Sequence, residues 1–332
     1  SQSGRLRFLN EYLSSTDSSR HNRTLWLERI RKTRDAKDRE YARRRRKRRA
    51  PYFTAPEGTG PSLQKLPTPV HRKEVSCCII CKDEEENIKR CLESVKWCDE
   101  IVIVDSFSSD KTISICQQYP TRIIQRTWPG YVEQKRFALT QAKNNWVLNV
   151  DADEEVTPFL RKEIESVLQQ DDPAVDGYYI PRLVRYLGKW WWRGWYPGYR
   201  LRLFRKEKVN WGGVNPHEKV LLRGTADHLR GNLYHYTYDD ISDHLQTING
   251  LTDVSSRELS ASKRPVKASA MLFRPLWRFV SFYFVRGCFL DGIPGLFISA
   301  TSAFYVFLKY AKMAEQTSFS SQGLIESAPN ET

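Results

Sequence analysis

Four acidic side chains fall within five positions of the segment VLNVDADEEV, directly after an apolar run. Residues at i and i+2 of an extended segment point to the same side, so Asp151 and Asp153 can converge on one object. Because carboxylates this close repel each other, we expect a positive group beside them. A divalent cation attached to a diphosphate fits, since Mg²⁺ usually takes one or two protein carboxylates and completes its shell with phosphate oxygens and water. The segment therefore predicts a Mg²⁺ or Mn²⁺ site.

An Asp-x-Asp triplet alone also fits a solvated acidic loop. Its position here favours a binding site, because the triplet follows one apolar strand and Asp105 ends an earlier one, EIVIVD. Parallel sheets bind ligands beyond the carboxyl ends of their strands. We therefore expect Asp105, Asp151 and Asp153 to border one crevice.

The elements that must position these acids alternate between strands and helices from Val75 onward. This alternation predicts an α/β fold with a mostly parallel sheet and helices on both faces. Thr157 and Pro158 have the residue types of a helix start, and Asp83 and Glu86 have the spacing of a capping box. The predicted strands are SCCIIC, EIVIVD, RIIQRTW and WVLNVDADEE, and the predicted helices are KDEEENIKRCLESV, 113–118, YVEQKRFALTQA and TPFLRKEIESVLQQ.

Charge divides the chain into a basic leader and a nearly neutral body. The formal charge is +14, and the first 74 residues hold 20 Lys and Arg against 8 Asp and Glu. The block Arg43–Arg49 suggests an anionic partner, which is either a lipid surface or a nucleic acid. We predict four parts: a basic extension and linker (1–74), the α/β domain (75–260), amphipathic helices (261–316) and a polar tail (317–332).

Seven cysteines are an odd number, and three of them lie in the apolar segment SCCIIC. Cys78 and Cys81 have the CxxC spacing of zinc and redox sites. No second CxxC and no suitably spaced His pair supports zinc. We therefore interpret these thiols as small buried strand residues.

Several motifs together resemble family 2 glycosyltransferases, which have the GT-A fold. They are VSCCIICKDEEENIKRCLESV, EIVIVDSFSSDKT and WVLNVDADEEV. Further motifs are similar to the lipopolysaccharide inner-core β-glucosyltransferase type: GYVEQKRFAL, YRLRLFRK, the HE of NPHEKV, LYHYTY and GCFLDGIPGL. The resemblance covers roughly 75–314. It implies inverting transfer of a hexose, expected to be glucose, from a UDP-type sugar to a lipopolysaccharide-core or other lipid-linked acceptor.

The resemblance also implies residue roles. The nucleotide base would lie near Cys81, Lys82 and Glu84, and Asp105 would hydrogen-bond the uracil or ribose. Asp151 would contact the ribose and the metal, Asp153 would bind the metal, and Gln134 and Lys135 would lie near the donor. A polyprenyl-phosphate acceptor is one alternative, and a nucleic-acid-binding protein acting through Arg43–Arg49 is another. The acids at several strand ends favour the enzyme.

Inverting transfer needs a base that takes a proton from the acceptor hydroxyl. Glu218 is our first choice, with His217 orienting it or binding the leaving phosphate. Asp239 and Asp240 are rivals for the base. On the segment YRLRLFRK, Arg202 and Arg205 fit a diphosphate clamp, because guanidinium groups fork onto phosphate oxygens. The alternative is that they line the wet face of a strand.

Two aromatic segments suggest surfaces. The run KWWWRGWY fits an acceptor or interface surface better than a deep core, because two cations interrupt it. In 271–312, Arg274, Arg278 and Arg286 recur at helical spacing among apolar residues. Such a helix can lie in a membrane interface, and Pro294 is expected to break the apolar run. We therefore expect peripheral or re-entrant attachment at the cytoplasmic face of a bacterial inner membrane. The alternative is a pair of core helices. An oligomer is also possible.

Overall fold

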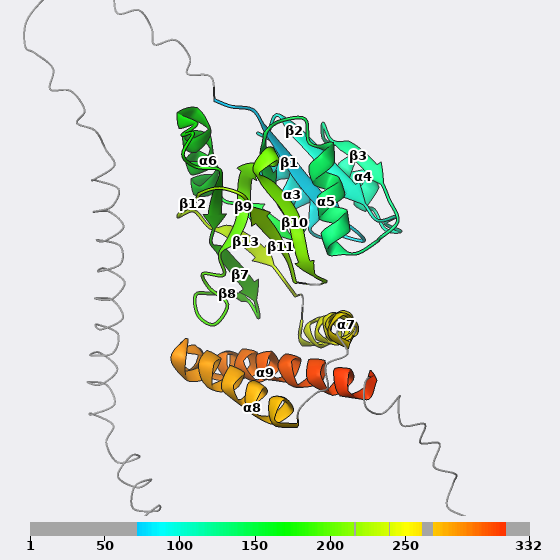
Figure 1. Ribbon diagram of the computed structural model, residues 1–332, viewed down its shortest axis with the longest axis vertical. Coiled ribbons are helices and arrows are strands. Elements are labelled where there is room, and N and C mark those ends of the chain that lie inside the picture. The colour runs from blue at the N-terminus through cyan, green and yellow to red at the C-terminus, as the bar shows by residue number, and fades with distance from the viewer. Residues whose placement is uncertain (1–71, 216, 239, 261–267, 317–332) are drawn as a thin grey trace, which may run out of the picture. The chain divides into compact units, whose positions relative to one another are not determined.

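The computed structural model describes residues 72–316 apart from 216, 239 and 261–267. The predictions for the Arg43–Arg49 block, for nearly all of the basic leader and for the polar tail therefore lie outside the described residues. The described chain consists of a central sheet flanked by helices, two smaller sheets and three long C-terminal helices (Figure 1).

The central sheet has seven strands in the order β12-β6-β9-β4-β1-β2-β3. Strand β1 pairs in parallel with β2 and β4, and β2 pairs in parallel with β3. Strand β9 is antiparallel to both of its neighbours. The predicted α/β fold with a mostly parallel sheet is confirmed. The strands are β1 (Val75–Cys81), β2 (Glu100–Asp105), β3 (Arg122–Gln125), β4 (Trp146–Asn149), β6 (Gly177–Ile180), β9 (Arg200–Arg205) and β12 (Ala226–His228).

Helices cover both faces of the sheet because side chains alternate along β1. Cys77 and Ile79 join a core with one group of helices, whereas Cys78 and Ile80 join a second core on the other face. The first group is α3 (Ile88–Val95), α4 (Thr112–Cys116) and α6 (Pro158–Gln170); α5 (Tyr131–Gln141) lies on the second face. The thiols of SCCIIC are free and buried, as predicted.

The two predicted helix starts have different outcomes. Thr157 caps α6 by accepting a hydrogen bond from the Leu160 amide at 3.2 Å, as predicted. The capping box at Asp83 is wrong, because α3 begins at Ile88 and its N-cap residue makes no side-chain cap. Asp83 instead accepts a hydrogen bond from the Ser109 amide at 2.7 Å and so joins two loops at the sheet edge.

The acidic segment joins two sheets. Strand β4 ends at Asn149, a turn follows, and β5 (Glu154–Val156) begins a separate four-stranded sheet in the order β5-β13-β7-β8. The single strand predicted over this region is therefore two strands. The other members are β7 (Arg182–Tyr186), β8 (Lys189–Trp191) and β13 (Leu233–Tyr236). Strands β10 (Val209–Val214) and β11 (His217–Leu222) form a separate two-stranded sheet.

The aromatic run KWWWRGWY divides between core and surface. Trp191 is fully buried, whereas Trp192 is 55% exposed. Trp190 lies against Tyr234, with ring centroids 4.2 Å apart. The exposed surface is therefore limited to part of the run, because Trp191 ends β8 in the core and Trp192 lies in the loop that follows.

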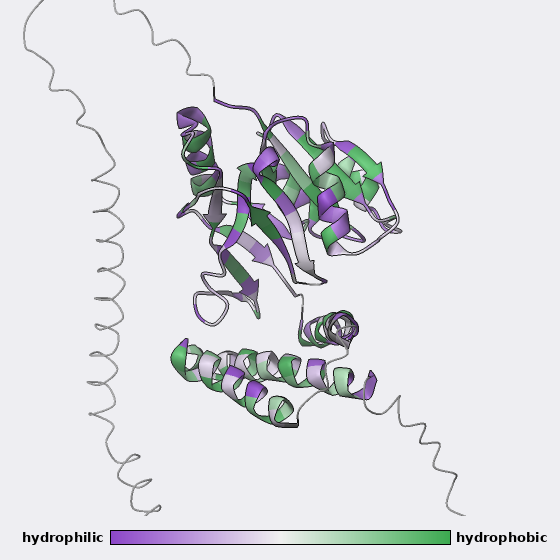
Figure 2. Ribbon diagram, in the orientation of Figure 1, coloured by the Kyte–Doolittle hydropathy of each residue, from purple (hydrophilic) through white to green (hydrophobic). Residues whose placement is uncertain are grey.

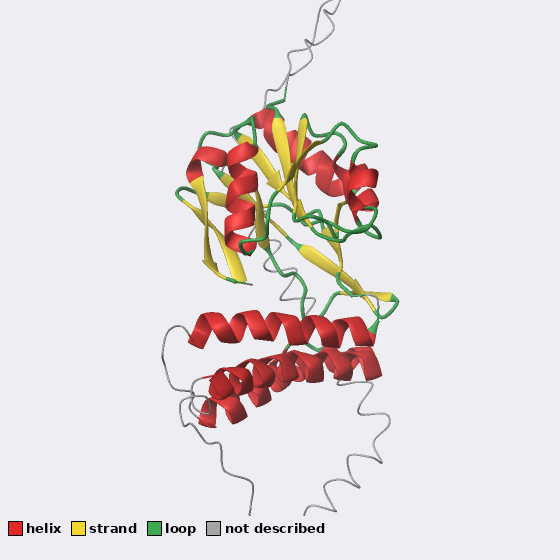
Figure 3. Cartoon of the chain, turned by 90° about the vertical axis from the view of Figure 1, so that its right-hand side faces the viewer, coloured by secondary structure: helices red, strands yellow, loops and turns green. Residues whose placement is uncertain are grey.

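The C-terminal part is helical. Helix α9 (Gly292–Ala314) contacts both α7 (Ile241–Ser260) and α8 (Ala268–Val280), and the three lie side by side in Figures 1 and 3. A π-helical turn (Ser281–Val285) and a 3-10 turn (Cys288–Asp291) connect α8 to α9. Pro294 lies in the first turn of α9, where the helix tolerates it. Pro294 was expected to break the apolar run, but it lies where helix α9 starts.

Figure 2 shows that hydrophobic residues predominate on α8 and α9, with some hydrophilic residues between them, and several large apolar side chains of these helices are exposed. Leu272 is 65% exposed and Trp277 is 67% exposed, both on α8. A helix that covered the sheet as core would bury these residues, so the core-helix alternative does not describe α8. Among the described residues, one segment, Cys288–Ala314, is long and apolar enough to cross a membrane by length and composition.

Candidate functional site

The turn between β4 and β5 brings Asp151 and Asp153 to one cavity of about 460 Å³. We call it the aspartate cavity. It lies beyond the carboxyl end of β1, where parallel sheets bind ligands. Three residues predicted to receive the nucleotide base, Cys81, Lys82 and Glu84, also line it. Its other lining residues are Ile80, Trp128, Tyr131, Lys135, Ala152, Glu218, His235 and Val254.

Buried cations hold both carboxylate oxygens of Asp151. Lys135 Nζ lies 2.9 Å from Oδ1, and Arg202 donates to both oxygens through its two terminal nitrogens. Burial by itself raises the pKa of Asp151, but the charges of Arg202 and Lys135 outweigh it, so this pKa lies well below its ordinary value. Asp151 is therefore a permanent anion whose oxygens are already engaged by protein donors.

Arg202 also pairs with a second acid of this segment, Glu154. Its Nη2 atom lies 2.6 Å from Glu154 Oε1, and its Nη1 atom donates to Asn149 Oδ1 at 2.8 Å. Arg202 and Glu154 are both almost fully buried. Side chains from β9 and α5 thus supply positive charge that the crowded acids require.

Asp153 has a different partner. Its Oδ2 atom lies 2.9 Å from His235 Nε2, because β13 pairs with β5 and sets His235 opposite Glu154. Burial raises the pKa of Asp153, and His235 more than reverses this effect, so the pKa lies below its ordinary value. Our sequence reasoning gave His235 no role. The only sequence signal for His235 was the motif LYHYTY, which does not indicate that His235 contacts Asp153.

The two aspartates therefore differ as metal ligands. Among residues 72–316 that the structure describes, no group of three or more His, Cys, Asp and Glu side chains is placed to hold a metal ion. Asp153 and His235 face the aspartate cavity without a Lys or Arg between them. Asp151, which we also predicted as a ligand, is paired with Arg202 and Lys135.

Glu218 meets Lys135 at the junction of two cavities. Glu218 comes from β11 and its Oε1 atom lies 2.7 Å from Lys135 Nζ. Burial lowers the pKa of Lys135, but Asp151 and Glu218 outweigh this, so the pKa lies above its ordinary value. A second cavity of about 640 Å³, which we call the arginine cavity, shares Lys135, Asp151 and Glu218 with the aspartate cavity. Glu218 can therefore face ligands on both sides.

The other candidates for the base role do not lie at this junction. The backbone of His217 belongs to β11 beside Glu218, but its side chain is outside what the structure describes, as is Asp239. Asp240 accepts a hydrogen bond from the Asp243 amide at 2.8 Å at the start of α7 and lines neither cavity. Of the candidate bases whose side chains are described, Glu218 is the one that borders both cavities.

Two predicted contact residues, Asp105 and Gln134, lie away from the cavity walls. Asp105 ends β2 as predicted, but it is fully buried and accepts hydrogen bonds from Ser108 and Gln125. Gln134 is also fully buried and donates to Ser106 Oγ at 3.0 Å. Both side chains support the loop after β2, and neither lines a cavity where it could contact a ligand directly.

Arg202 and Arg205, predicted together as a diphosphate clamp, do not lie together: Arg202 lines the arginine cavity and Arg205 does not. Residues three apart on a strand face opposite sides, and Arg205 lies toward the far end of β9. Its Nη2 atom is 2.8 Å from Asp171 Oδ1, and its guanidinium lies over Trp146. Arg205 therefore connects the end of β9 to the C-terminal end of α6, whereas Arg202 lines the arginine cavity. Arg182 and Arg200, which line the arginine cavity, had no role in our sequence analysis.

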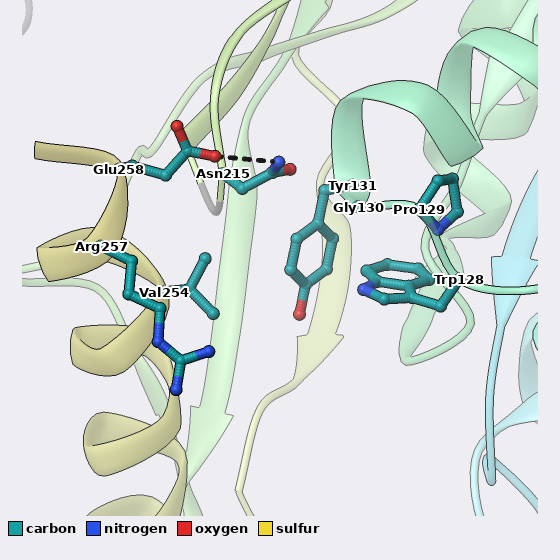
Figure 4. A pocket seen from close by; sticks show the side chains of 8 residues that line it. All are labelled: Trp128, Pro129, Gly130, Tyr131, Asn215, Val254, Arg257 and Glu258. Atoms are coloured by element: carbon teal, nitrogen blue, oxygen red, sulfur yellow. Dashed lines mark hydrogen bonds between the residues drawn. The ribbon is translucent and has the colours of Figure 1, made fainter. Parts of the chain in front are cut away.

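A third cavity of about 430 Å³, the tryptophan cavity, adjoins the aspartate cavity and shares Trp128, Tyr131 and Val254 with it. Trp128 and Tyr131 meet edge to face, with ring centroids 4.7 Å apart. Across the cavity, Arg257 projects from α7, and Asn215 donates to Glu258 at 3.2 Å (Figure 4). The loop before α5 and helix α7 thus form one wall each.

Comparison with known proteins gives consistent results. The family model described as Glycosyl transferase family 2 matches residues 76–229. The chain is similar to an uncharacterized glycosyltransferase of Rickettsia typhi, with 31% identity over 255 residues, covering 73% of this chain and 87% of the relative. It is also similar to the lipopolysaccharide core biosynthesis glycosyltransferase LpsC of Rhizobium meliloti, with 30% identity over 267 residues, covering 76% and 97%. Among solved structures, the mannosyltransferase PcManGT from Pyrobaculum calidifontis, in complex with GDP-Man and Mn²⁺, covers 76% of this chain and 90% of its own, with 14% identity and a TM-score of 0.47.

Proposed function

Because the chain belongs to glycosyl transferase family 2, we propose that it transfers a hexose from a nucleotide-diphosphate sugar to a lipopolysaccharide-core saccharide. The observation that carries the proposal is the junction of two cavities at Glu218, Lys135 and Asp151. A transferase needs two substrates to meet at one base. The similarity to LpsC over nearly its whole length supports the lipopolysaccharide-core acceptor.

The donor occupies the aspartate cavity, with its base near Cys81, Lys82 and Glu84. Burial raises the pKa of Glu84 to about 7, and nearby Asp153 and Asp151 add to the effect. A concentration of carboxylates this strong favours binding of a cationic or metal-complexed ligand. Asp105 and Gln134 act indirectly, by fixing the loop that follows β2. The glucose and UDP identities are part of the proposal.

A divalent cation fits beside Asp153, since Mg²⁺ and Mn²⁺ prefer carboxylate oxygen and take the rest of their ligands from phosphate and water. His235 lies next to Asp153 and either joins the ligand set or holds the carboxylate in place. When bound, the cation neutralises charge on the leaving diphosphate. Asp151 keeps its pairs with Arg202 and Lys135 and contacts the donor through that fixed arrangement.

Glu218 acts as the general base. The acceptor hydroxyl oxygen attacks the anomeric carbon and its proton passes to a Glu218 carboxylate oxygen, while the bond to the diphosphate oxygen breaks and that oxygen keeps the electron pair. Attack from the side opposite the leaving group inverts the configuration. Lys135 positions Glu218 through the 2.7 Å contact between Nζ and Oε1.

The enzyme works at the cytoplasmic face of the bacterial inner membrane. Support comes from the exposed apolar side chains of α8, from the basic residues among them and from the apolar segment Cys288–Ala314. Cations near anionic lipid contribute roughly 1 kcal/mol each. A lipid-linked acceptor is therefore presented where the enzyme is attached. A polyprenyl-phosphate acceptor is the second candidate, and the same apolar face favours it.

The test is a donor screen on the full chain, scored by released nucleoside diphosphate, with Mg²⁺, with Mn²⁺ and with chelator. We expect a metal-dependent UDP-sugar reaction. Glu218→Gln should lower the rate roughly 100-fold or more, because a general base contributes 10²–10⁴-fold, while UDP binding is kept. Asp153→Asn should remove the metal dependence. Glu165→Gln, on the exposed face of α6, serves as the control.

The proposal fails if no nucleotide sugar is bound or consumed with either metal. It also fails if Glu218→Gln turns over as fast as Glu165→Gln. A second screen compares lipopolysaccharide-core oligosaccharide with polyprenyl phosphate as acceptor, and the preferred acceptor decides between the two candidates.

A further inference from the structure

The arginine cavity carries more positive charge than its acids can balance. Its cationic lining residues are Lys135, Arg182, Arg200, Arg202 and Lys219, and its acidic ones are Asp151 and Glu218. Lys135 and Arg202 already form the ion pairs with Asp151 and Glu218 described above. Arg182 reaches only Glu154, at 3.5 Å. Two cations, Arg200 and Lys219, remain.

Arg200 and Lys219 have no carboxylate partner among the residues that the structure describes. The Arg200 guanidinium donates to the carbonyl of Tyr199 at 3.3 Å. Its pKa lies below the ordinary value, first because the group is partly desolvated and then because Arg182 and Arg202 repel its charge. An anion bound between these groups would relieve that repulsion.

The cavity also offers aromatic surface. Tyr179, Tyr199 and Trp211 line it, and Tyr199 meets the ring of His228 edge to face at 4.9 Å. Aromatic faces give sugar rings an apolar platform, while a phenol hydroxyl can hydrogen-bond the ring substituents. A cavity of about 640 Å³ is large enough for more than one sugar residue.

The position of the cavity decides which substrate it takes. It opens onto Glu218 from the side away from Cys81, Lys82 and Glu84, which line only the aspartate cavity. If the donor occupies the aspartate cavity, the reacting hydroxyl of the acceptor must approach Glu218 from the arginine cavity. The unpaired cations therefore lie on the acceptor side of the reaction.

We propose that the arginine cavity is the acceptor subsite and that it selects an anionic saccharide, whose phosphate or carboxylate binds Arg200 and Lys219 while a neighbouring hydroxyl faces Glu218. This inference rests on the proposed function for the identity of the second substrate. Guanidinium groups bind phosphate and carboxylate alike through paired N–H donors. The two kinds of anion are distinguished by experiment.

The experiment titrates the full chain, saturated with UDP and Mn²⁺, with glucose 6-phosphate, glucuronic acid and glucose in a calorimeter. We expect the anionic sugars to bind and glucose to bind much more weakly. The stronger of the two anionic sugars identifies the preferred acidic group. In Arg200→Gln and Lys219→Gln, affinity for that sugar should fall about tenfold, the usual effect of losing one charge-assisted hydrogen bond.

Arg257→Gln is the matched control, because Arg257 borders the neighbouring tryptophan cavity. This variant should bind the anionic sugar as the unmodified chain does. Arg200 lies at the start of β9 and leaves no buried acid unpaired when it is replaced, so the variant should fold; its unfolding temperature checks this. In transfer assays with lipopolysaccharide-core oligosaccharide, Arg200→Gln should raise the acceptor KM and leave the donor KM unchanged.

Three results would overturn the inference. They are equal binding of glucose and the anionic sugars, a loss of affinity in Arg257→Gln in place of Arg200→Gln, or a rise in the donor KM of Arg200→Gln with the acceptor KM unchanged. The last result would assign the arginines to the donor diphosphate. Failure of the proposed function gives a different result: the chain would then bind no UDP-sugar, whatever the titration with acceptor sugars shows.

Discussion

At the scale of single residues, the site is a chain of alternating charges. Lys135 lies between Asp151 and Glu218, and Arg202 lies between Asp151 and Glu154. Each buried charge is balanced by a neighbour, which is the condition under which a protein tolerates charge in its interior. This arrangement fixes Asp151 and Glu218 relative to each other, because Lys135 contacts both.

Replacing Lys135 by Met tests this coupling. The substitution leaves Glu218 without its ion-pair partner and removes one cation from Asp151. We expect the free energy of unfolding to fall by about 3 kcal/mol, since breaking a buried ion pair typically costs 3–5 kcal/mol, and transfer activity to fall more than tenfold. Urea unfolding and initial rates measure the two effects.

Lys96→Met is the control for this substitution. Lys96 pairs with Glu93 on the protein surface, with both side chains about half exposed, and such pairs contribute at most about 1 kcal/mol. If Lys135→Met is as stable and as active as Lys96→Met, the central role of Lys135 is refuted.

At the scale of elements, one small core joins the second sheet to the C-terminal helices. Tyr186 from β7 and Trp191 from β8 pack with Ile298 of α9 and Cys288 before it. Asp291 adds ion pairs to Lys189 at 2.7 Å and to Arg193 at 3.2 Å. The aromatic run KWWWRGWY therefore has a structural part that fixes the helices and an exposed part that remains available to a partner.

His244 of α7 makes this core sensitive to pH. The imidazole Nδ1 lies 3.0 Å from the Tyr186 hydroxyl, and the ring stacks on Tyr238 at 4.0 Å. Trp195 and Phe297 also face it, and Asp243 is the nearby acid. Burial lowers the pKa of His244 to about 4, and Asp243 only partly opposes the shift.

The lowered pKa predicts acid destabilisation. Between about pH 6.5 and pH 4 the unfolded chain binds a proton at His244 that the folded chain does not, so stability falls as pH falls through this window. We expect the unfolding temperature to fall less between pH 7 and pH 5 in His244→Phe than in the unmodified chain. Thermal unfolding at both pH values measures this. An identical loss in both proteins would show that His244 does not titrate in this way.

At the scale of the whole molecule, the proposed membrane attachment would involve two regions of different character. The described helix α8 presents exposed apolar residues with Arg274 and Arg278 among them. The leader, outside the described residues, carries much of the positive charge. The first would act through the hydrophobic effect and the second through electrostatics, and only the second should weaken strongly with salt.

Liposome flotation separates the two contributions. Leu276→Gln together with Trp277→Gln should reduce binding at all salt concentrations, because these side chains are 56% and 67% exposed. Removal of residues 1–74 should weaken binding and make the remainder less sensitive to salt. Phe159→Gln is the control, since Phe159 is 58% exposed on α6, away from this surface. Equal flotation of all four proteins contradicts membrane attachment through either region.

The sequence alone determined the features that depend on neighbours along the chain. Apolar runs and amphipathic spacing identified the strands of the parallel sheet and the helices between them, and the Thr157 cap followed from the adjacent residues Thr157 and Pro158. The placement of Asp151 and Asp153 after a buried strand was likewise local. These predictions agree with the structure because secondary structure and burial follow short periodicities in the sequence.

Only the tertiary structure decided which charges meet. Arg202 reaches Asp151 across 51 positions of sequence and His235 reaches Asp153 across 82. Such contacts depend on strand order and register, which no local pattern contains. The same reason explains the positions of Arg205 and Asp105: each has the residue type for the site and a suitable place in the sequence, but Arg205 lies beside the start of β4 and pairs with Asp171, and Asp105 is fully buried.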